Sequence, residues 1–568
     1  MRLLFDRRHE LQDKSQRLIR RLQRARLTAQ LLIGIAQCRQ HYIFDQDNKS
    51  SGDDGTEYEA PSKVLAINMD RIQDSLIQYL EFVRSNLSAK DFAADIPDVA
   101  SLVADFGLDA NIAFTIGRSS INYAIAEHTE QVKAEVSDKQ DNSQPPKSEQ
   151  QTEGDTEMKD SASTESPNGQ LANGETPAPN AKEAGATDQS PAPGEGVTLA
   201  PPSSDTVNGS QEVSHPVLNE LAERFRAILP QEFEDTLDIP FFIRFWQLTL
   251  NDMQVPAASY TDEFKRLQSE IVRIGADRSN ISAAGVRERE RRKKEVMTLQ
   301  DRLQAENKSR ISEYSAVRRK LLKEKDHWFA RFPRNKHEAV NSALLQECFL
   351  PRIVLSPMDA MYTFKMLLFL HQNGTPGFYT MHLLDEFFNE KRLAMIIYQC
   401  TPKETLNLGR FLLDLLKELQ RWHASSDTYE KSALGLKKDL PGFARKFAPD
   451  GTPQLLNYEE YRSLLFKWHR NLANALKVSF SSEEYMRINN AMHILDIIKG
   501  IFPVVNFMGA QLRDALVDLH QKETRADLKI AIGSIADALK KKESSWILPQ
   551  AFHMVRHHVQ LALRRFQN

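Results

Sequence analysis

The stretch from Ser356 to Gly442 constrains the fold more than any other part of this 568-residue chain. Four segments with the apolar spacing of helices follow one another in it. Two of them begin with a capping signal, SPMD at 356–359 and TPKE at 401–404. In each signal a hydroxyl at the N-cap accepts from backbone N–H groups, proline takes the first helical position, and an acid faces the positive end of the helix dipole. The stretch therefore predicts a stack of helices.

The composition extends this prediction to the whole chain. Glycine is sparse, with 23 residues, while the residues that favour helices are abundant. The pairs Trp422-His423 and Trp468-His469 lie 46 residues apart, a period typical of HEAT-like helix pairs, and Trp328 lies about two periods before Trp422. We predict an all-α fold: a HEAT-like stacked helical array with a long protruding helix and a disordered acidic insertion.

The charge and the cysteines restrict the class of protein. The formal net charge is only -3, so no global charge indicates a nucleic-acid partner. The cysteines, Cys38, Cys348 and Cys400, are isolated and odd in number, which argues against a disulfide framework and for a reducing compartment. The first residues lack the apolar core of a signal peptide, and no nearby apolar run approaches the roughly 20 residues of a membrane helix. We expect a soluble intracellular protein without a membrane contact.

Motifs for catalysis are missing from the sequence. It contains no phosphate-binding GxxxxGK[ST], no GxGxxG after a strand, and no GxSxG, HExxH or kinase set. His553 and His557 have the spacing of one helix face, but no cysteine near them completes a zinc site. We expect no enzyme activity, no cofactor and no metal.

A change of composition divides the chain. Residues 131–210 carry 14 acidic and 5 basic side chains, and no aromatic residue occurs between Tyr123 and Phe225. Such a segment cannot bury enough apolar surface to offset the entropy of ordering it, so we expect a disordered linker. The predicted parts are an N-terminal helical segment, the acidic linker, a second helical segment, a long charged helix and a C-terminal helical array, at 1–129, 130–212, 213–285, 286–331 and 332–568.

A long helix is predicted from Arg287 to Arg331. It opens with the run RERERRKKE and carries 15 basic and 8 acidic residues. Two apolar runs follow heptad spacing, but polar residues between them interrupt the seam, so a self-dimerising coiled coil is not expected. The helix is interpreted as a protruding arm that packs on helices of another chain, with a solvated connecting helix as the alternative.

Two basic surfaces are candidates for partner or nucleic-acid contact. One is on the arm, and the other is on an amphipathic helix expected over residues 1–43. The alternative for both is an ordinary solvated helix face. The candidate contact residues are Arg287, Arg291, Arg292, Lys293, Lys294, Tyr314, Leu321, Arg20, Arg21 and Arg24.

The window 239–248, IPFFIRFWQL, is the most aromatic in the chain. Aromatic side chains that stack on bases are exposed and lie among basic residues, but this window contains only Arg244. The window is therefore predicted to be core.

Several blocks of the sequence resemble the THO complex subunit 2 family. They are the blocks at 328–378, which begins WFARFPRNKHEAV, and at 400–431, which begins CTPKETLNLGRF, together with FFIRFWQLTLNDM at 241–253 and PGF at 441–443. The resemblance implies a nuclear, non-catalytic scaffold that couples transcription elongation to mRNA packaging and nuclear export. Its implied partners are other THO subunits, and the DEAD-box RNA helicase and export adaptor that join THO in the TREX complex.

The same resemblance implies that the chain corresponds to a middle-to-C-terminal portion, as a fragment or from an incomplete gene. The long basic tail found in many members has no counterpart before the chain stops at Asn568, where only a short basic helix is expected. Contact with an mRNP is therefore expected mainly through partners. Direct RNA or DNA binding by the basic helical faces stays open as the alternative function.

Overall fold

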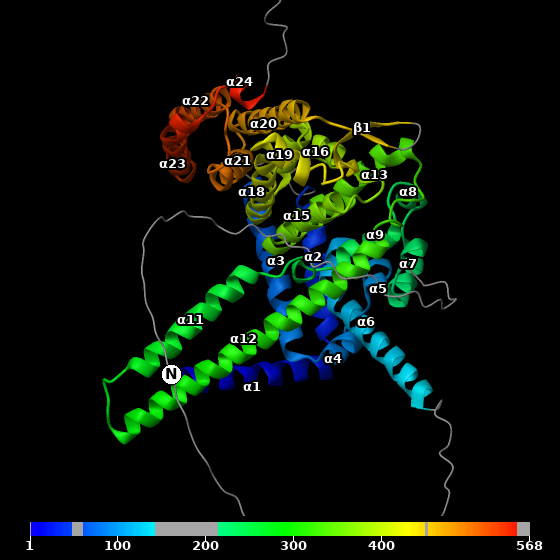
Figure 1. The fold of residues 1–568 in the computed structure, drawn as a ribbon, viewed down its shortest axis with the longest axis vertical. Coiled ribbons are helices and arrows are strands. Elements are labelled where there is room, and N and C mark those ends of the chain that lie inside the picture. Colours follow the sequence, from blue (N-terminus) through cyan, green and yellow to red (C-terminus); the bar gives the residue numbers. More distant parts are fainter. Residues whose placement is uncertain (1, 48–60, 142–213, 449–451, 554–568) are drawn as a thin grey trace, which may run out of the picture. The chain divides into compact units, whose positions relative to one another are not determined.

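The computed structural model describes residues 2–47, 61–141, 214–448 and 452–553 (Figure 1). Two compact units divide the chain: one combines Met1–Glu130 with Glu212–Asn568, and the other is Gln131–Gln211. Most of the second unit, and with it the expected disorder of the acidic segment, lies outside the described residues. His557 and most of the expected basic C-terminal helix also lie outside them. The first unit is an all-α array of helices with one small sheet in its described part.

Six helices precede the acidic segment. They are α1 (Arg2–Arg24), α2 (Thr28–Asp47), α3 (Pro61–Asn86), α4 (Ala89–Asp95), α5 (Val99–Ala104) and α6 (Ala110–Asp141). Because α6 reaches Asp141, the start of the segment predicted as linker is helical.

The prediction of one helix over residues 1–43 is wrong, because α1 and α2 are separate. The break is a Schellman motif, in which Leu27 N donates to Leu22 O at 2.9 Å and Arg26 N to Gln23 O at 3.0 Å. Arg26 takes the left-handed position, with φ 55. Glycine usually occupies this position, and the arginine found there does not signal a break.

The aromatic window forms a buried helix, as predicted. It is α9 (Ile239–Gln247), and every side chain in it except that of Pro240 is buried. Short helices surround it in the chain: α7 (Pro216–Ile228), α8 (Gln231–Glu234) and α10 (Leu250–Met253). The rings of Phe241, Phe245 and Trp246 each contact other aromatic rings of the core.

Two arginines, the buried Arg352 and the half-buried Arg118, tie α9 to the rest of the first unit. Arg352 donates to Leu248 O at 2.5 Å and to Phe245 O, and Arg118 donates to Trp246 O at 2.9 Å. They satisfy carbonyls at the C-terminal end of α9, which carries partial negative charge. Asp359 lies 3.0 Å from Arg352 Nε and 3.6 Å from Arg118 Nη2, and so balances the charges of both arginines.

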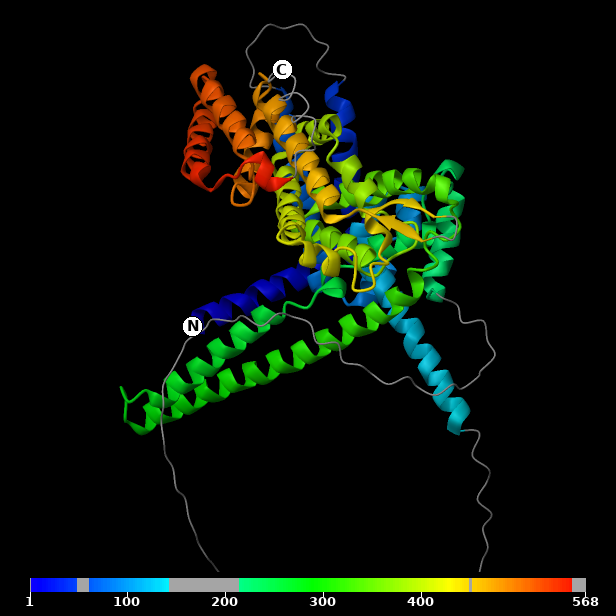
Figure 2. The same cartoon turned by 45° about the horizontal axis from the view of Figure 1, so that its top comes forward.

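The long charged helix is α12 (Ala283–Glu324), which ends seven residues before the predicted end at Arg331. It is preceded by α11 (Ala257–Ala276), and Figures 1 and 2 show the two lying side by side in opposite directions. Both extend away from the bulk of the first unit, on the side toward which α1 also runs. We call the pair α11–α12, with the connecting residues 277–282, the arm.

The remaining helices form the C-terminal part of the array. They are α13 (His337–Ala343), a π-helix (Leu344–Phe349), α14 (Leu350–Leu355), α15 (Pro357–Gln372), α16 (Thr380–Phe387), α17 (Glu390–Gln399), α18 (Pro402–His423), α19 (Ser426–Ser432), α20 (Tyr458–Phe480), α21 (Tyr485–Ile498), α22 (Asn506–Lys522), α23 (Ala526–Lys542) and α24 (Pro549–Phe552), with short 3₁₀ turns at Arg334–Lys336, Pro441–Phe443 and Glu543–Ser545.

The loop predicted after Leu440 contains two short strands. Strands β1 (Ala444–Phe447) and β2 (Pro453–Leu455) pair antiparallel. The tryptophan spacing does not mark a structural repeat, because Trp328 follows the end of α12, Trp422 lies at the end of α18 and Trp468 lies inside α20.

Both predicted capping signals are present. Ser356 Oγ accepts from Asp359 N at 3.1 Å at the start of α15. Thr401 and Glu404 form a complete capping box at the start of α18, with Thr401 N donating to Glu404 Oε2 at 3.0 Å. Between these helices, Gly374 and Gly377 adopt positive φ of 60 and 80, which explains the glycines of the predicted break.

Candidate functional site

The arm is held together by an apolar seam of its own. On α11 the seam residues follow the 4-3-4-3 spacing of a coiled coil: Tyr260, Phe264, Leu267, Ile271 and Ile274. Leu267 and Ile274 are buried, yet neither belongs to the main hydrophobic core. The helical stripe of α12 that includes Val296 and Leu303 is half-buried against them. The arm is therefore an antiparallel helix pair with a local core.

Polar contacts across the seam explain the residues that interrupt it. Glu306, which breaks the heptad pattern of α12, accepts a hydrogen bond from Tyr260 Oη at 2.9 Å. Gln300 Nε2 donates to Gln268 Oε1 at 3.2 Å. The apolar stripe of α12, which we expected to meet another chain, thus packs on α11 of the same chain.

The base of the arm is fixed by a buried ion pair. Glu324, the last residue of α12, accepts from Arg244 Nε at 2.8 Å and also from Arg244 Nη2. Both side chains are almost fully buried, and Arg244 Nη1 also donates to Gln247 Oε1 at 3.0 Å. This bidentate geometry fixes both the position and the direction of the end of α12.

The candidate contact residues at the base differ in exposure. Leu321 is 1% exposed and belongs to the main core, so its side chain is covered within the chain. Tyr314 is half-buried and lines a small cavity of about 250 Å³ with Arg318 and Lys365. Of these two candidates, therefore, only Tyr314 is exposed enough to contact a partner.

The basic run of the arm is exposed but partly neutralised. Arg291 pairs with Glu288 at 2.6 Å and with Glu295 at 3.3 Å, and Arg292 lies 3.7 Å from Glu270 of α11. Such exposed pairs contribute little to stability and are screened by salt. They do lower the net positive field that a phosphate backbone would meet.

Four cations of the run form no ion pair with the described part of the chain: Arg287, Arg289, Lys293 and Lys294. Arg289 instead donates to Asn280 O at 2.6 Å. The four cations lie together on the first turns of α12, near the tip of the arm. A local positive charge therefore remains there for an acidic partner.

Exposed apolar side chains lie along the outer surface of the arm. Val286, Met297 and Ile311 are between 41% and 48% exposed, and their spacing of 11 and 14 residues places them on one face of α12. At the tip, Ile281 is 82% exposed. An apolar row beside a basic run is typical of a surface that packs on an amphipathic, acidic helix.

The other candidate arginines lie on a different element. Arg20, Arg21 and Arg24 are exposed on the last turns of α1, which packs against α2 and α3. The base of the arm packs against α10 instead, and Arg318 lies over the ring of Phe369 of α15 at 5.8 Å. The structure therefore does not place the two sets of candidate residues on one element.

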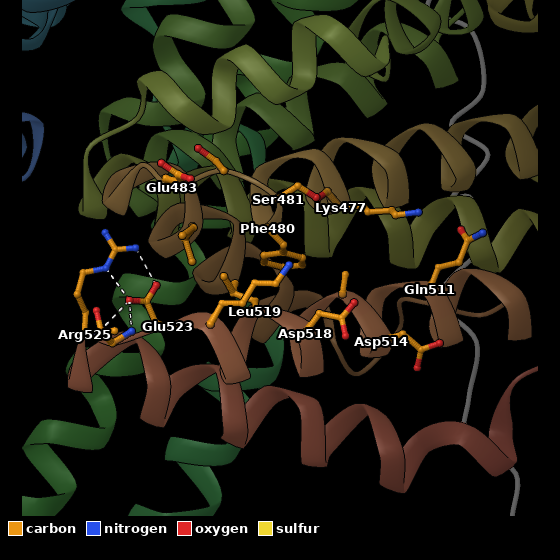
Figure 3. Close-up of a pocket in the computed structure, with 15 residues that line it drawn as sticks. Lys477, Phe480, Ser481, Glu483, Gln511, Asp514, Asp518, Leu519, Glu523 and Arg525 are labelled. Carbon is orange, nitrogen blue, oxygen red and sulfur yellow. Dashed lines mark hydrogen bonds and ion pairs between the residues drawn. The ribbon is translucent and has the colours of Figure 1, made fainter.

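A cavity of about 750 Å³ lies between α20, α22 and the start of α23 (Figure 3). Figure 3 shows Asp514 and Asp518 on one side and Lys477 on another, with Glu523 paired to Arg525 at one end. Charges of both signs line it, so it favours no single class of ligand.

Within the described ranges, no group of three or more histidine, cysteine, aspartate or glutamate side chains is arranged to hold a metal ion. Over the same residues, no helix combines the length and the apolarity needed to cross a membrane.

A family profile matches the whole arm and most of the helices that follow it in the chain. The profile, described as "Transcription factor/nuclear export subunit protein 2", covers residues 234–539, which is more than half of the chain. The chain belongs to this family, Tho2. The matched range runs from α8 to α23 and includes the whole arm.

Individual members of the Tho2 family are similar over long ranges. THO complex subunit 2 of Arabidopsis thaliana is 26% identical over 531 residues, which cover 93% of this chain and 25% of that protein. The human protein of the same name is 30% identical over 326 residues, 56% of this chain and 20% of that protein. That of Saccharomyces cerevisiae is 24% identical over 200 residues. The chain thus spans about a quarter or less of the length of these relatives.

The residues that first suggested the Tho2 family are packing positions. Phe443 of the PGF block is fully buried, and its ring centroid lies 5.7 Å from that of Trp422 and 5.5 Å from that of His371. Burial lowers the pKa of His371 to about 4, so this imidazole is neutral near pH 7. The residues of this block that carry the resemblance therefore belong to the core.

Two features of the arm were not predicted from the sequence: the pairing of α12 with α11 and the anchor between Glu324 and Arg244. The first had a signal, since the 4-3-4-3 spacing on α11 matches an antiparallel partner for α12. The second had none, because the two partners lie 80 residues apart in the chain.

Proposed function

We propose that the chain acts as a non-catalytic scaffold within a THO complex, and that the arm is a contact site for other subunits. Membership of the Tho2 family supports the role in the complex. The observation that carries the role of the arm is its shape and surface: two helices with their own seam, a buried anchor at the base, and exposed apolar and basic residues outside. Because both helices of the arm are largely exposed, most of the arm contributes little to the main core, and its surface is suited to binding another subunit.

In this proposal the scaffold works in the nucleus and couples transcription elongation to mRNA packaging and export. The complex would recruit a DEAD-box RNA helicase and an export adaptor, as the family resemblance implies. Contact with mRNA would then be mainly through these partners. The partial pairing of the basic run supports indirect contact with mRNA. Glu288 and Glu295 pair with Arg291, and Glu270 pairs with Arg292.

The test compares the full chain with a variant whose arm is shortened. Because Gln268 and Gln300 face each other across the seam, residues 270–298 can be replaced by a short Gly-Ser linker near that pair. Both proteins are immobilised and incubated with nuclear extract at native salt, and the recovered proteins are identified by mass spectrometry. We expect the full chain to recover other THO subunits, and the shortened variant to lose at least one of them.

The matched control replaces Arg20, Arg21 and Arg24 with glutamine and leaves the arm intact. It should recover the same subunits as the full chain. If the full chain recovers no THO subunit, the scaffold role is wrong. If the shortened variant recovers all of them, the arm is not the contact site.

Direct nucleic-acid binding is a second candidate, favoured by the unpaired cations Arg287, Lys293 and Lys294. Phosphate contacts release counterions, so such binding must weaken steeply as salt rises. A labelled 20-nucleotide RNA should bind the full chain at about 50 mM salt and lose affinity when these three residues become glutamine. No binding at that salt concentration, with the chain folded, would remove this candidate.

A further inference from the structure

Two edges of α12 flank the seam of the arm. The residues of one edge directly follow half-buried seam positions and repeat every seven residues: Met297, Gln304 and Ile311. The residues of the other edge directly precede half-buried seam positions at the same spacing: Arg292, Leu299 and Glu306. We call the side of the arm with Met297, Gln304 and Ile311 the open side, and the opposite side the bridged side.

Charged groups join the two helices on the bridged side only. There Arg292 lies 3.7 Å from Glu270 of α11, and Glu306 accepts from Tyr260. On the open side none of the three edge residues of α12 is charged. The edge of α11 on that side is also uncharged and consists of Thr261, Gln268 and Gly275. The open side is therefore the one on which another apolar element can approach the seam.

A hollow of about 370 Å³ lies between α11 and α12 on the open side. Phe264, which is 38% exposed, and Gln304 both line it. Met297 lies seven residues before Gln304 and Ile311 seven residues after it, and both apolar side chains are 48% exposed. The open side thus offers three apolar contact points, spaced about 10 Å apart along α12.

This spacing matches an α-helix that lies along the arm. The side chains of a helix in a coiled coil return to the same face every seven residues, which is about 10 Å. Those of an extended segment return to one face about every 7 Å, so they would not stay in step with Met297, the hollow and Ile311. A helix on the open side would form a three-helix bundle with α11 and α12, and the exposed apolar side chains would become part of its core.

The charges that border the open side favour an acidic helix. The next residues outward on α12 are Lys294, Asp301 and Lys308, and Lys265 of α11 lines the hollow. The three lysines form no ion pair with the described part of the chain. Three cations against one anion are complementary to a helix whose flanking residues are acidic.

We propose that the open side of the arm binds one α-helix of another subunit. The apolar stripe of this helix packs on Met297, Phe264 and Ile311, and its flanking positions are mainly aspartate and glutamate. Arg318 follows Ile311 by seven residues and lies over the ring of Phe369 of α15, so the binding surface ends there and extends toward the tip. The inference rests on the proposed function, because it specifies the class of partner and the side of the arm that this partner contacts.

Photo-crosslinking tests which side of the arm meets the partner. The residue p-benzoylphenylalanine replaces Gln304 on the open side of one full chain and Leu299 on the bridged side of another. Both proteins are irradiated in nuclear extract at native salt, and the cross-linked segments are sequenced by mass spectrometry. At Gln304 we expect a segment whose apolar residues recur at spacings of three and four and whose other residues are mainly acidic. The same product should be about fivefold less abundant from Leu299.

A pair of matched substitutions tests the same contact without a cross-linker. Met297→Glu and Leu299→Glu each place a carboxylate on α12, at side chains that are 48% and 49% exposed. The two variants differ in the side of the arm that they alter, and thermal unfolding checks that both are folded. Met297→Glu should lower recovery of the subunit about fivefold or more, because it buries a charge in the apolar contact and repels the acidic helix. Leu299→Glu should lower it less than about twofold.

The outcomes separate this inference from the proposed function. If the full chain recovers no THO subunit, or the variant with the shortened arm recovers all of them, the proposed function fails and the inference fails with it. If the shortened arm loses a subunit but Met297→Glu and Leu299→Glu act alike, the arm remains the contact site and only the helix on the open side is wrong. A cross-link from Gln304 to RNA, to a second copy of this chain or to a segment without the acidic helical pattern also overturns the inference, as does the absence of any cross-link.

Discussion

Glu324 receives two hydrogen bonds from Arg244, and this buried pair joins the last residue of the arm to the aromatic core helix α9. Removing one partner of a buried ion pair leaves the other charge uncompensated. We expect Glu324→Ala to lower the stability of the chain by about 3–5 kcal/mol, measured by chemical denaturation.

The control for that experiment is Glu313→Ala, which breaks the exposed pair with Arg310 at 3.2 Å on the same helix. It should change stability by less than about 1 kcal/mol. Equal effects of the two substitutions would show that the buried pair does not anchor the arm.

The seam of the arm should unfold locally, without unfolding of the main core. Leu267→Ala creates a cavity between α11 and α12, which typically costs about 2–5 kcal/mol at a buried leucine. Because Leu267 lies outside the main core, hydrogen exchange should accelerate in the arm and stay unchanged in α15 and α18. Val272→Ala, at a side chain that is 62% exposed, serves as the control. Accelerated exchange throughout the array would contradict a local core.

The buried His469 should make the chain sensitive to acid. Burial, with smaller effects from His423 and Lys542, lowers the pKa of His469 to about 3. The unfolded chain therefore binds this proton more tightly than the folded chain, and stability falls as the pH drops from about 6.5 toward 3. At pH 5 the contribution of this group is a loss of about 2 kcal/mol relative to pH 8.

The variant His469→Phe tests this prediction, since its ring can keep the contacts with Phe502 and Phe552. The melting temperature of the variant relative to the wild type should be higher at pH 5 than at pH 8. A difference that does not depend on pH would mean that His469 titrates alike in the folded and unfolded chain.

Asp70 should hold the N-terminal helices to the C-terminal array. Its carboxylate caps α18, where it accepts from Thr401 Oγ1 and the backbone of Lys403. We expect Asp70→Ala to cost about 1–2 kcal/mol and to accelerate hydrogen exchange at the first turn of α18. Asp74→Ala, which removes only the exposed partner of Lys403, should have a smaller effect. If the two substitutions act alike, the cap contributes no more than a surface charge.

Local signals in the sequence predicted much of the fold, because they act within a few residues. The capping residues Ser356 and Thr401 begin their helices as predicted, since hydroxyl, proline and acid are read within one turn. The buried window around α9 was also predicted, since eight apolar residues in ten leave no polar face. The break at Arg26 was missed, because an arginine occupies a position that normally holds glycine.

Contacts between distant segments explain what could not be predicted. The pair Arg244–Glu324 joins residues from two helices, and the cap of α18 comes from Asp70, 331 residues before Thr401. In the sequence, Glu324 and Asp70 do not differ from ordinary surface charges, whereas Arg244 stands in the window predicted to be core. The candidate site was predicted in part: the basic run is exposed on the arm, whereas Leu321 is buried in the core because the base of α12 enters it.

The length of the arm has a mechanical consequence. At 1.5 Å per residue, α12 measures about 63 Å from Ala283 to Glu324. Because α12 is anchored at Glu324, a small rotation about that end would be amplified along the length of the helix. A tilt of about 5° at that end displaces the far end by about 5 Å, roughly one helical turn. A small rotation of α9 that leaves its packing unchanged would thus move a protein bound near Ile281 by several ångströms. Conversely, a force on that protein would exert a torque on the aromatic core.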